Sequence, residues 1–191
     1  MRRIGITGGI GSGKSVVSRL LRIMGYSVYD TDSEAKRLME SSLEVVQKLS
    51  ECFGRDIYHN GRLNLGLLSS RVFGESDKIV LLNSIVHPVV RFDFYRWSES
   101  LNEEICFVES AILYESRFDE LVDEVWTVTA PEELRISRVR QRSGLTEEEI
   151  KKRMAAQLSE EEKQRRAAHI IWNDGNVSVI HRVLSLLKSL E

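Results

Sequence analysis

The feature that most constrains the fold is a glycine-rich run near the start of the chain. It follows the β-forming segment Arg3–Thr7, precedes a helical pattern and reads Gly8-Gly9-Ile10-Gly11-Ser12-Gly13-Lys14-Ser15. This is the pattern G-x-x-x-x-G-K-[ST] in the strand–loop–helix context that the motif requires. The glycines let backbone N–H groups turn inward around phosphate, and the helix N-terminus adds positive potential. The alternative is a flexible glycine-rich turn.

The roles of the run follow from the chemistry of phosphate. Lys14 is expected to reach the β- and γ-phosphates of a nucleotide, and Ser15 is expected to bind Mg²⁺. The sequence therefore predicts ATP and Mg²⁺ as cofactors. The residues predicted to bind the nucleotide are Gly9, Ile10, Gly11, Ser12, Gly13, Lys14, Ser15 and Val16.

Strand and helix patterns alternate along the chain. Such alternation predicts an α/β fold, a parallel sheet with helices on both faces, in which sites gather at the carboxyl ends of the strands. The five expected strands are Arg3–Thr7, Ser27–Asp30, Ile105–Glu109, Glu124–Thr129 and Ile170–Asn173.

The second and third expected strands are separated by far more chain than a parallel crossover needs, which is about a dozen residues. We therefore expect an inserted helical subdomain on the acceptor side of the site. Its expected helices, with a break at His87-Pro88, are Ser33–Met39, Leu43–Cys52, Leu65–Phe73 and Lys78–Leu101.

Three charged helices are expected after the fourth strand, at Pro131–Gln141, Glu147–Leu158 and Glu160–Ala168. Capping-box patterns open the last two, at Thr146 with Glu149 and at Ser159 with Glu162. On the first helix, Arg135, Arg138 and Arg142 share one face. We expect these arginines to form a lid that neutralises phosphate charge; a solvated face paired with residues 147–149 and a nucleic-acid patch are the alternatives.

Carboxylates close two of the expected strands. Asp30 and Asp32 lie at the end of the second strand: one is expected to orient a substrate hydroxyl and the other to support Mg²⁺, if the first two strands lie near each other. The alternative is that Asp32 only caps the following helix. Glu109 closes the third strand, either behind the Mg²⁺ site or as an ordinary surface acid.

Composition excludes several classes of function. The 191 residues carry a net charge of -2 with a pI of about 6.1, so no overall positive field favours nucleic acid or an anionic membrane. There is neither a signal-peptide core nor a run of membrane-spanning length. Cys52 and Cys106 stand far apart, which indicates reduced thiols and a cytoplasmic location. The four histidines show no metal-ligand spacing.

Motifs in the same order resemble the dephospho-CoA kinase family over nearly the whole chain. They are Ile6–Ser15, Val28–Asp32, Phe53-Gly54, Gly61–Leu63, His87-Pro88, Ile112–Glu115, Arg138–Arg142, Gly144-Leu145, Arg153, Gln157 and Asn173. The resemblance implies ATP-dependent phosphorylation of the ribose 3′-hydroxyl of dephospho-CoA, which gives coenzyme A and ADP in the last step of coenzyme A biosynthesis.

Roles carried over from this resemblance fall on particular residues. Asp32 is implied as the catalytic carboxylate, with Lys14, Arg138 and Arg142 as the cations acting on the phosphates. The implied substrate-binding residues are Asp32, His87 and Glu109, and the expected metal ligands are Ser15 and Asp30. Three positions depart from the family pattern: Val16 replaces a Thr, Glu109-Ser110-Ala111 replaces Asp-x-Pro, and His169 replaces an Asp.

Together these observations predict a P-loop NTPase-type parallel five-stranded sheet with a helical acceptor-binding insertion and a helical lid. One kinase domain, 1–191, is expected to divide into a core (1–32, 101–130 and 168–191), an insertion (33–100) and a lid (131–167). We expect a monomer or weak homo-oligomer with no nucleic-acid or membrane partner. Another small-molecule kinase of nucleoside or nucleotide monophosphate type is the alternative, whereas a GTPase-like switch lacks its N-K-x-D signature.

Overall fold

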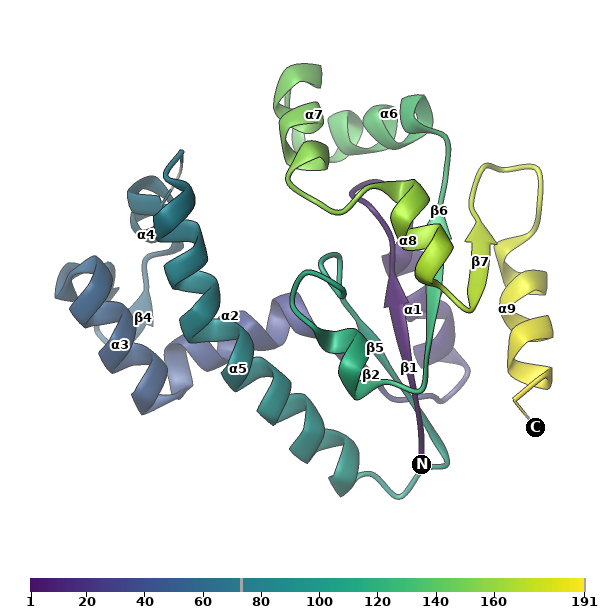
Figure 1. Cartoon of the computed structure of the whole chain (residues 1–191), viewed down its shortest axis with the longest axis horizontal. Helices are drawn as coiled ribbons and strands as arrows, with labels where there is room; N and C mark the ends of the chain where they lie inside the picture. The colour runs from purple at the N-terminus through teal and green to yellow at the C-terminus, as the bar shows by residue number, and fades with distance from the viewer. Residues whose placement is uncertain (73, 191) are drawn as a thin grey trace. The chain divides into compact units, whose positions relative to one another are not determined.

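The computed structural model of the chain describes residues 1–72 and 74–190. The end of the helix expected over Leu65–Phe73 and the last residue of the expected core, Glu191, lie outside this range. The chain divides into two compact units, one formed by Met1–Tyr29 with Asn102–Glu191 and the other by Asp30–Leu101. The first unit combines strands and helices, whereas the second is mainly helical (Figure 1).

A five-stranded sheet organises the fold, as predicted. Its strand order is β2-β5-β1-β6-β7, and the pairs β1–β5, β1–β6 and β6–β7 are parallel. The first two strands of the sequence are not neighbours, because β5 lies between them. The strands are β1 (Arg2–Thr7), β2 (Val28–Asp30), β5 (Ile105–Glu109), β6 (Glu124–Thr129) and β7 (His169–Trp172).

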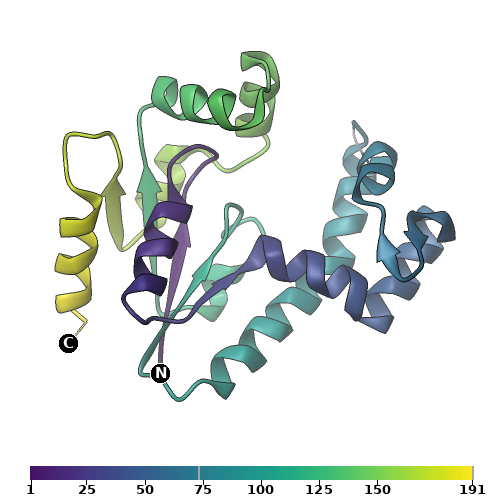
Figure 2. The ribbon, with the colours of Figure 1, turned by 180° about the vertical axis from the view of Figure 1, so that it is seen from behind.

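Helices cover both faces of this sheet. Figures 1 and 2, seen from opposite sides, show α1 (Lys14–Ile23) on one face and α8 (Glu160–Arg166) on the other. Helix α9 (Val179–Lys188) packs beside α1. Strand β1 lies at the centre of the sheet. The core between sheet and helices is apolar and closed to solvent, and it includes Ile4, Ile6, Val17, Leu21, Phe107, Trp126, Val128, Ile171 and Val183.

Helices α6 (Glu132–Ser143) and α7 (Glu147–Ala155) precede α8 and pack on each other through Ile136, Val139 and Ile150. The capping box predicted at Thr146 is complete, because Thr146 and Glu149 each bond the other's backbone. The box predicted at Ser159 is only half formed. Ser159 accepts from the amide of Glu162, but the Glu162 carboxylate binds arginines of its own helix instead.

The second unit is mainly helical. Its elements are α2 (Thr31–Ser41), α3 (Leu43–Phe53), the 3₁₀ turn Arg55–Ile57, the hairpin β3 (Tyr58–His59) and β4 (Arg62–Leu63), α4 (Leu65–Val72) and α5 (Ser76–Ser100). The hairpin turns at Asn60 and Gly61, which both have positive φ.

The break predicted at His87-Pro88 is wrong, because α5 runs through Pro88. Proline removes one helical hydrogen bond, but Val86 before it and Val90 and Phe94 after it are all buried. Burial on both sides keeps the two halves in one helix. Although α5 is long, no helix within residues 1–72 and 74–190 has both the length and the apolar character needed to cross a membrane.

Candidate active site

The glycine-rich loop leaves the carboxyl end of β1, the central strand, and leads into α1. Two of its glycines have no room for a side chain. A Cβ on Gly8 would lie 2.0 Å from the carbonyl oxygen of Val128, and a Cβ on Gly13 would lie 2.0 Å from Asn173 Nδ2. Both have positive φ, which glycine adopts without strain. Neighbouring elements therefore pack closely against the loop, and only glycine fits at positions 8 and 13.

Polar groups concentrate at this loop. Lys14 Nζ donates to the carbonyl oxygens of Gly8, at 2.8 Å, and Gly9, at 3.3 Å, so the ammonium group is held against the loop. The hydroxyls of Thr7 and Ser12 are buried without a hydrogen-bond partner among the described residues. A buried hydroxyl is costly unless it is satisfied, so these donors suit a polar ligand. Ser15 and Val16 are exposed on the first turn of α1.

Arg138, predicted on the lid, joins α6 to the loop through Asn173. Arg138 Nη2 donates to the carbonyl oxygen of Asn173 at 2.9 Å, and Asn173 Nδ2 donates to the carbonyl oxygen of Ser12 at 2.9 Å. Arg138 Nη1 is buried without a partner among the residues described. Arg142, one turn later, is exposed. The two predicted lid arginines therefore have different surroundings.

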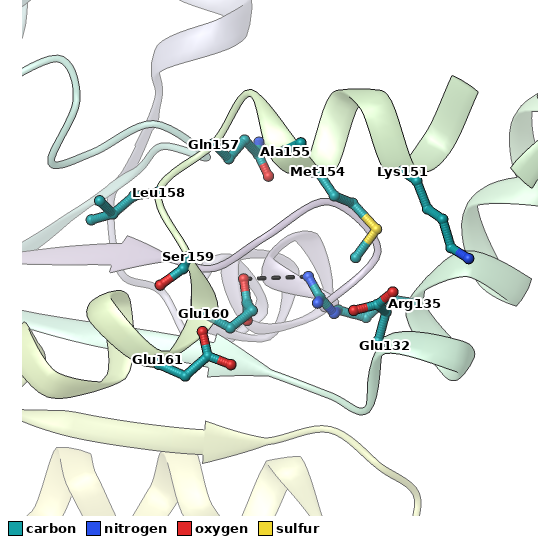
Figure 3. A pocket seen from close by; sticks show the side chains of 10 residues that line it. All are labelled: Glu132, Arg135, Lys151, Met154, Ala155, Gln157, Leu158, Ser159, Glu160 and Glu161. Atoms are coloured by element: carbon teal, nitrogen blue, oxygen red, sulfur yellow. Dashed lines mark ion pairs between the residues drawn. The ribbon is translucent and has the colours of Figure 1, made fainter. Parts of the chain in front are cut away.

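Three further residues lie at the loop: Arg135, which was expected on the lid, and Gln157 and Glu160, which received no role in the sequence analysis. Arg135, 6% exposed, lies 3.3 Å from the Glu160 carboxylate, so a solvated arginine face is wrong for this residue. Gln157 Oε1 accepts a hydrogen bond from the Ile10 amide at 3.0 Å. All three side chains line one pocket, which Figure 3 shows from close by. The volume of this pocket is about 410 Å³. Sequence spacing placed Arg135 beside Arg138 but carried no signal of its distant partner.

Asp30 and Asp32 lie at the start of α2. Asp30 is the N-cap: its Oδ1 accepts from the amides of Asp32, at 3.1 Å, and Ser33, at 3.2 Å. The alternative that Asp32 caps this helix is therefore wrong. Asp32 is exposed in the first turn, and its carboxylate takes no part in the cap.

The two remaining predicted residues lie on different elements. His87 is half-buried in the middle of α5, where burial and then the charge of Arg91 lower its pKa. Glu109 is the last residue of β5 and pairs in register with Ile6 of β1. Glu109 therefore lies at the same edge of the sheet as the glycine-rich loop.

This loop, with its lysine at the end of a central parallel strand and an arginine-bearing helix bonded to it, defines a P-loop kinase, an enzyme that uses a nucleotide as phosphoryl donor. The family model for dephospho-CoA kinase (CoaE) matches residues 2–178. The chain belongs to the dephospho-CoA kinase family, whose reaction is the final step of coenzyme A biosynthesis, and it is a phosphotransferase with an alcohol group as acceptor.

One relative and two solved structures are similar to nearly the whole chain. A dephospho-CoA kinase from Bacteroides fragilis is 41% identical over 98% of this chain and 92% of its own. The crystal structure of TT1252 from Thermus thermophilus is 36% identical, covers 99% of this chain and 97% of that chain, and has a TM-score of 0.86. Dephospho-CoA kinase from Campylobacter jejuni shares the fold, with a TM-score of 0.74 at 23% identity over 100% and 98% of the two chains.

Proposed function

We propose that this kinase transfers the γ-phosphoryl group of ATP, with Mg²⁺, to the ribose 3′-hydroxyl of dephospho-CoA. The observation that carries the proposal is the glycine-rich loop, where Lys14 is held on the Gly8 and Gly9 carbonyl oxygens and α6 is bonded to the loop through Asn173. Family membership supports the acceptor, since the matching family model is that of dephospho-CoA kinase.

On the donor side, residues 9–16 surround the polyphosphate, which is bound by Lys14 and by backbone N–H groups of the loop. Mg²⁺ keeps most of its water and usually takes only one or two protein ligands in addition to phosphate. That suits this chain, because residues 1–72 and 74–190 contain no group of three or more His, Cys, Asp or Glu side chains placed to hold a metal. The exposed hydroxyl of Ser15 is the direct ligand in this proposal. Asp30, whose carboxylate caps α2, acts through metal-bound water.

On the acceptor side, Asp32 accepts the hydrogen bond of the attacking hydroxyl and orients it toward the phosphorus. Its carboxylate is available because Asp30 performs the capping. Arg138 and Arg142 neutralise the charge that develops on the transferred group. Phosphoryl transfer needs little covalent help, so these residues act mainly by positioning and electrostatic stabilisation.

The acceptor itself is bound, in this proposal, by the insertion 33–100, which contains His87, and by Glu109 at the end of β5 in the core. A helical unit of closely similar extent, Asp30–Leu101, forms its own compact body, which supports a separate binding role. The core 1–32, 101–130 and 168–191 then serves the nucleotide, and the lid 131–167 encloses it.

The test is ADP release from Mg-ATP with dephospho-CoA, adenosine, AMP or no acceptor, and identification of the product by mass. Turnover with dephospho-CoA alone, giving coenzyme A, is expected. Turnover with AMP or adenosine instead would indicate a kinase of the nucleoside or nucleotide monophosphate type. ADP release that needs no acceptor would contradict the proposal.

A further inference from the structure

A buried ion pair lies directly against the glycine-rich loop. Arg135 Nη1 of α6 and Glu160 Oε1 of α8 are 3.3 Å apart, and their side chains are 7% and 14% exposed. A Cβ placed on Gly9 would be 2.5 Å from this Arg135 nitrogen and 2.2 Å from the Glu160 oxygen. Both charged groups therefore contact the backbone of Gly9 in the glycine-rich loop. Figure 3 shows the ion pair itself.

The pair is held from both sides. The carbonyl oxygen of Arg135 would lie 2.5 Å from a Cβ on Gly11, so the backbone of α6 also packs on the loop. Glu160 Oε2 accepts a hydrogen bond from Thr129 Oγ1 at 3.0 Å, and Gln164 supports that hydroxyl at 3.2 Å. The Glu160 carboxylate is thus anchored to the end of β6.

Arg135 retains an unused donor. Its Nε is buried and has no hydrogen-bond partner among the described residues. A buried donor without a partner is costly, and a guanidinium presents several donors in a plane that matches phosphate. The Glu160 carboxylate therefore leaves a donor of this guanidinium without an acceptor. A phosphate bound in the adjacent loop would supply further acceptor oxygens.

We propose that Arg135 is a further phosphate-site residue of the kinase, and that Glu160 is the counter-ion that holds it against Gly9 and restrains the affinity of the loop for polyphosphate. Because the charges have opposite sign and touch the same glycine, they act on a bound polyphosphate in opposite directions. The inference rests on the proposed function, since it concerns the nucleotide.

A purely structural pair makes a different prediction. If the pair only fastened α6 to α8, removal of either charge would leave the other buried and unpaired, and both variants would weaken nucleotide binding together. The sign of the change in affinity therefore separates the two roles.

The experiment measures Kd for ATP, ADP and AMP by titration calorimetry with the full chain carrying Arg135→Gln, Glu160→Gln or both. Arg135→Gln is expected to weaken ATP binding by about tenfold, the effect of losing one charge-assisted contact, and AMP binding by much less. Glu160→Gln keeps the shape of the side chain and its acceptor oxygen. It is expected to tighten ATP binding by about threefold, because it removes a negative charge close to the bound polyphosphate. The Kd of the double variant for ATP should lie between those of the two single variants, and this variant leaves no buried charge unpaired.

Arg140→Gln and Glu133→Gln are the matched controls, because both residues are exposed on α6 and neither lines the pocket of Arg135 and Glu160. Their ATP affinity should equal that of the wild type. Weaker ATP binding in both single variants, or an equal loss for AMP and ATP in Arg135→Gln, would overturn the inference. Failure of the wild type to bind ATP would instead refute the proposed function.

Discussion

At the scale of single residues, Asp32 and Lys14 serve different parts of the proposed reaction, and substitution should separate them. Asp32→Asn is expected to lower kcat by about a hundredfold or more, as loss of a general base does, with little change in ATP affinity. Lys14→Ala is expected to abolish turnover by removing the cation at the phosphates. Steady-state kinetics and ATP titration measure both effects.

The structure makes Asp32→Asn a clean test, because Asp30 caps α2 and the cap survives the change. Asp77→Asn is the matched control: this residue is also an exposed aspartate in the first turn of a helix, α5. A wild-type kcat in Asp32→Asn would remove this residue from the mechanism.

His87 should make stability depend on pH. Burial and Arg91 lower its pKa from the ordinary 6.5, so the unfolded chain binds this proton more readily than the folded one. As pH falls through about 6.5, the unfolded state is therefore stabilised by the proton and the folded state loses stability. His87→Gln is expected to reduce this loss, measured as the fall in thermal midpoint between about pH 7.5 and 5.5. His59→Gln, at the exposed second residue of β3, is the control and should keep the wild-type fall in thermal midpoint.

At the scale of elements, Pro88 is a local defect inside α5 that neighbouring burial overcomes. Its side chain is exposed, so Pro88→Ala removes no core packing and restores a helical N–H. In a helix interior, proline costs about 3 kcal/mol of stability relative to alanine. Removing the proline also raises the conformational entropy of the unfolded chain, and this entropy cancels part of the gain in stability. We expect a gain of about 1–2 kcal/mol in the free energy of unfolding, measured by urea denaturation. Pro131→Ala, at the N-cap of α6, should bring no such gain, and a destabilised Pro88→Ala would show that α5 needs its proline.

Local signals explain which elements the sequence predicted well. Strands β5 and β6 have the predicted ends because each is a compact run of β-forming residues. Helix α7 begins directly after Thr146, the first residue of its capping box. The interruption at Pro88 was predicted from a local rule that distant packing overrides. The hairpin β3–β4 consists of two-residue strands, too short for a period-two pattern.

In the candidate site too, local motifs could be predicted from the sequence, but contacts between distant residues could not. The glycine-rich loop is a local motif that its spacing predicts, whereas the contact of Arg135 with Glu160 joins residues on different helices and has no local signal. Likewise the choice of Asp30 over Asp32 as the cap depends on where β2 ends and α2 begins, which sequence patterns fix only to within a residue or two.

At the scale of the whole molecule, the division into two compact units suggests that each substrate has its own binding unit. Hydrogen exchange with one ligand at a time tests this, because ligands slow exchange where they order the backbone. ATP alone should protect the glycine-rich loop and α6–α8 of the first unit, and dephospho-CoA alone should protect α2–α5 of Asp30–Leu101. Lys14→Ala should lose the first pattern and keep the second, which controls for general stabilisation. If dephospho-CoA instead protected only the first unit, the insertion would not be the acceptor-binding part of this kinase.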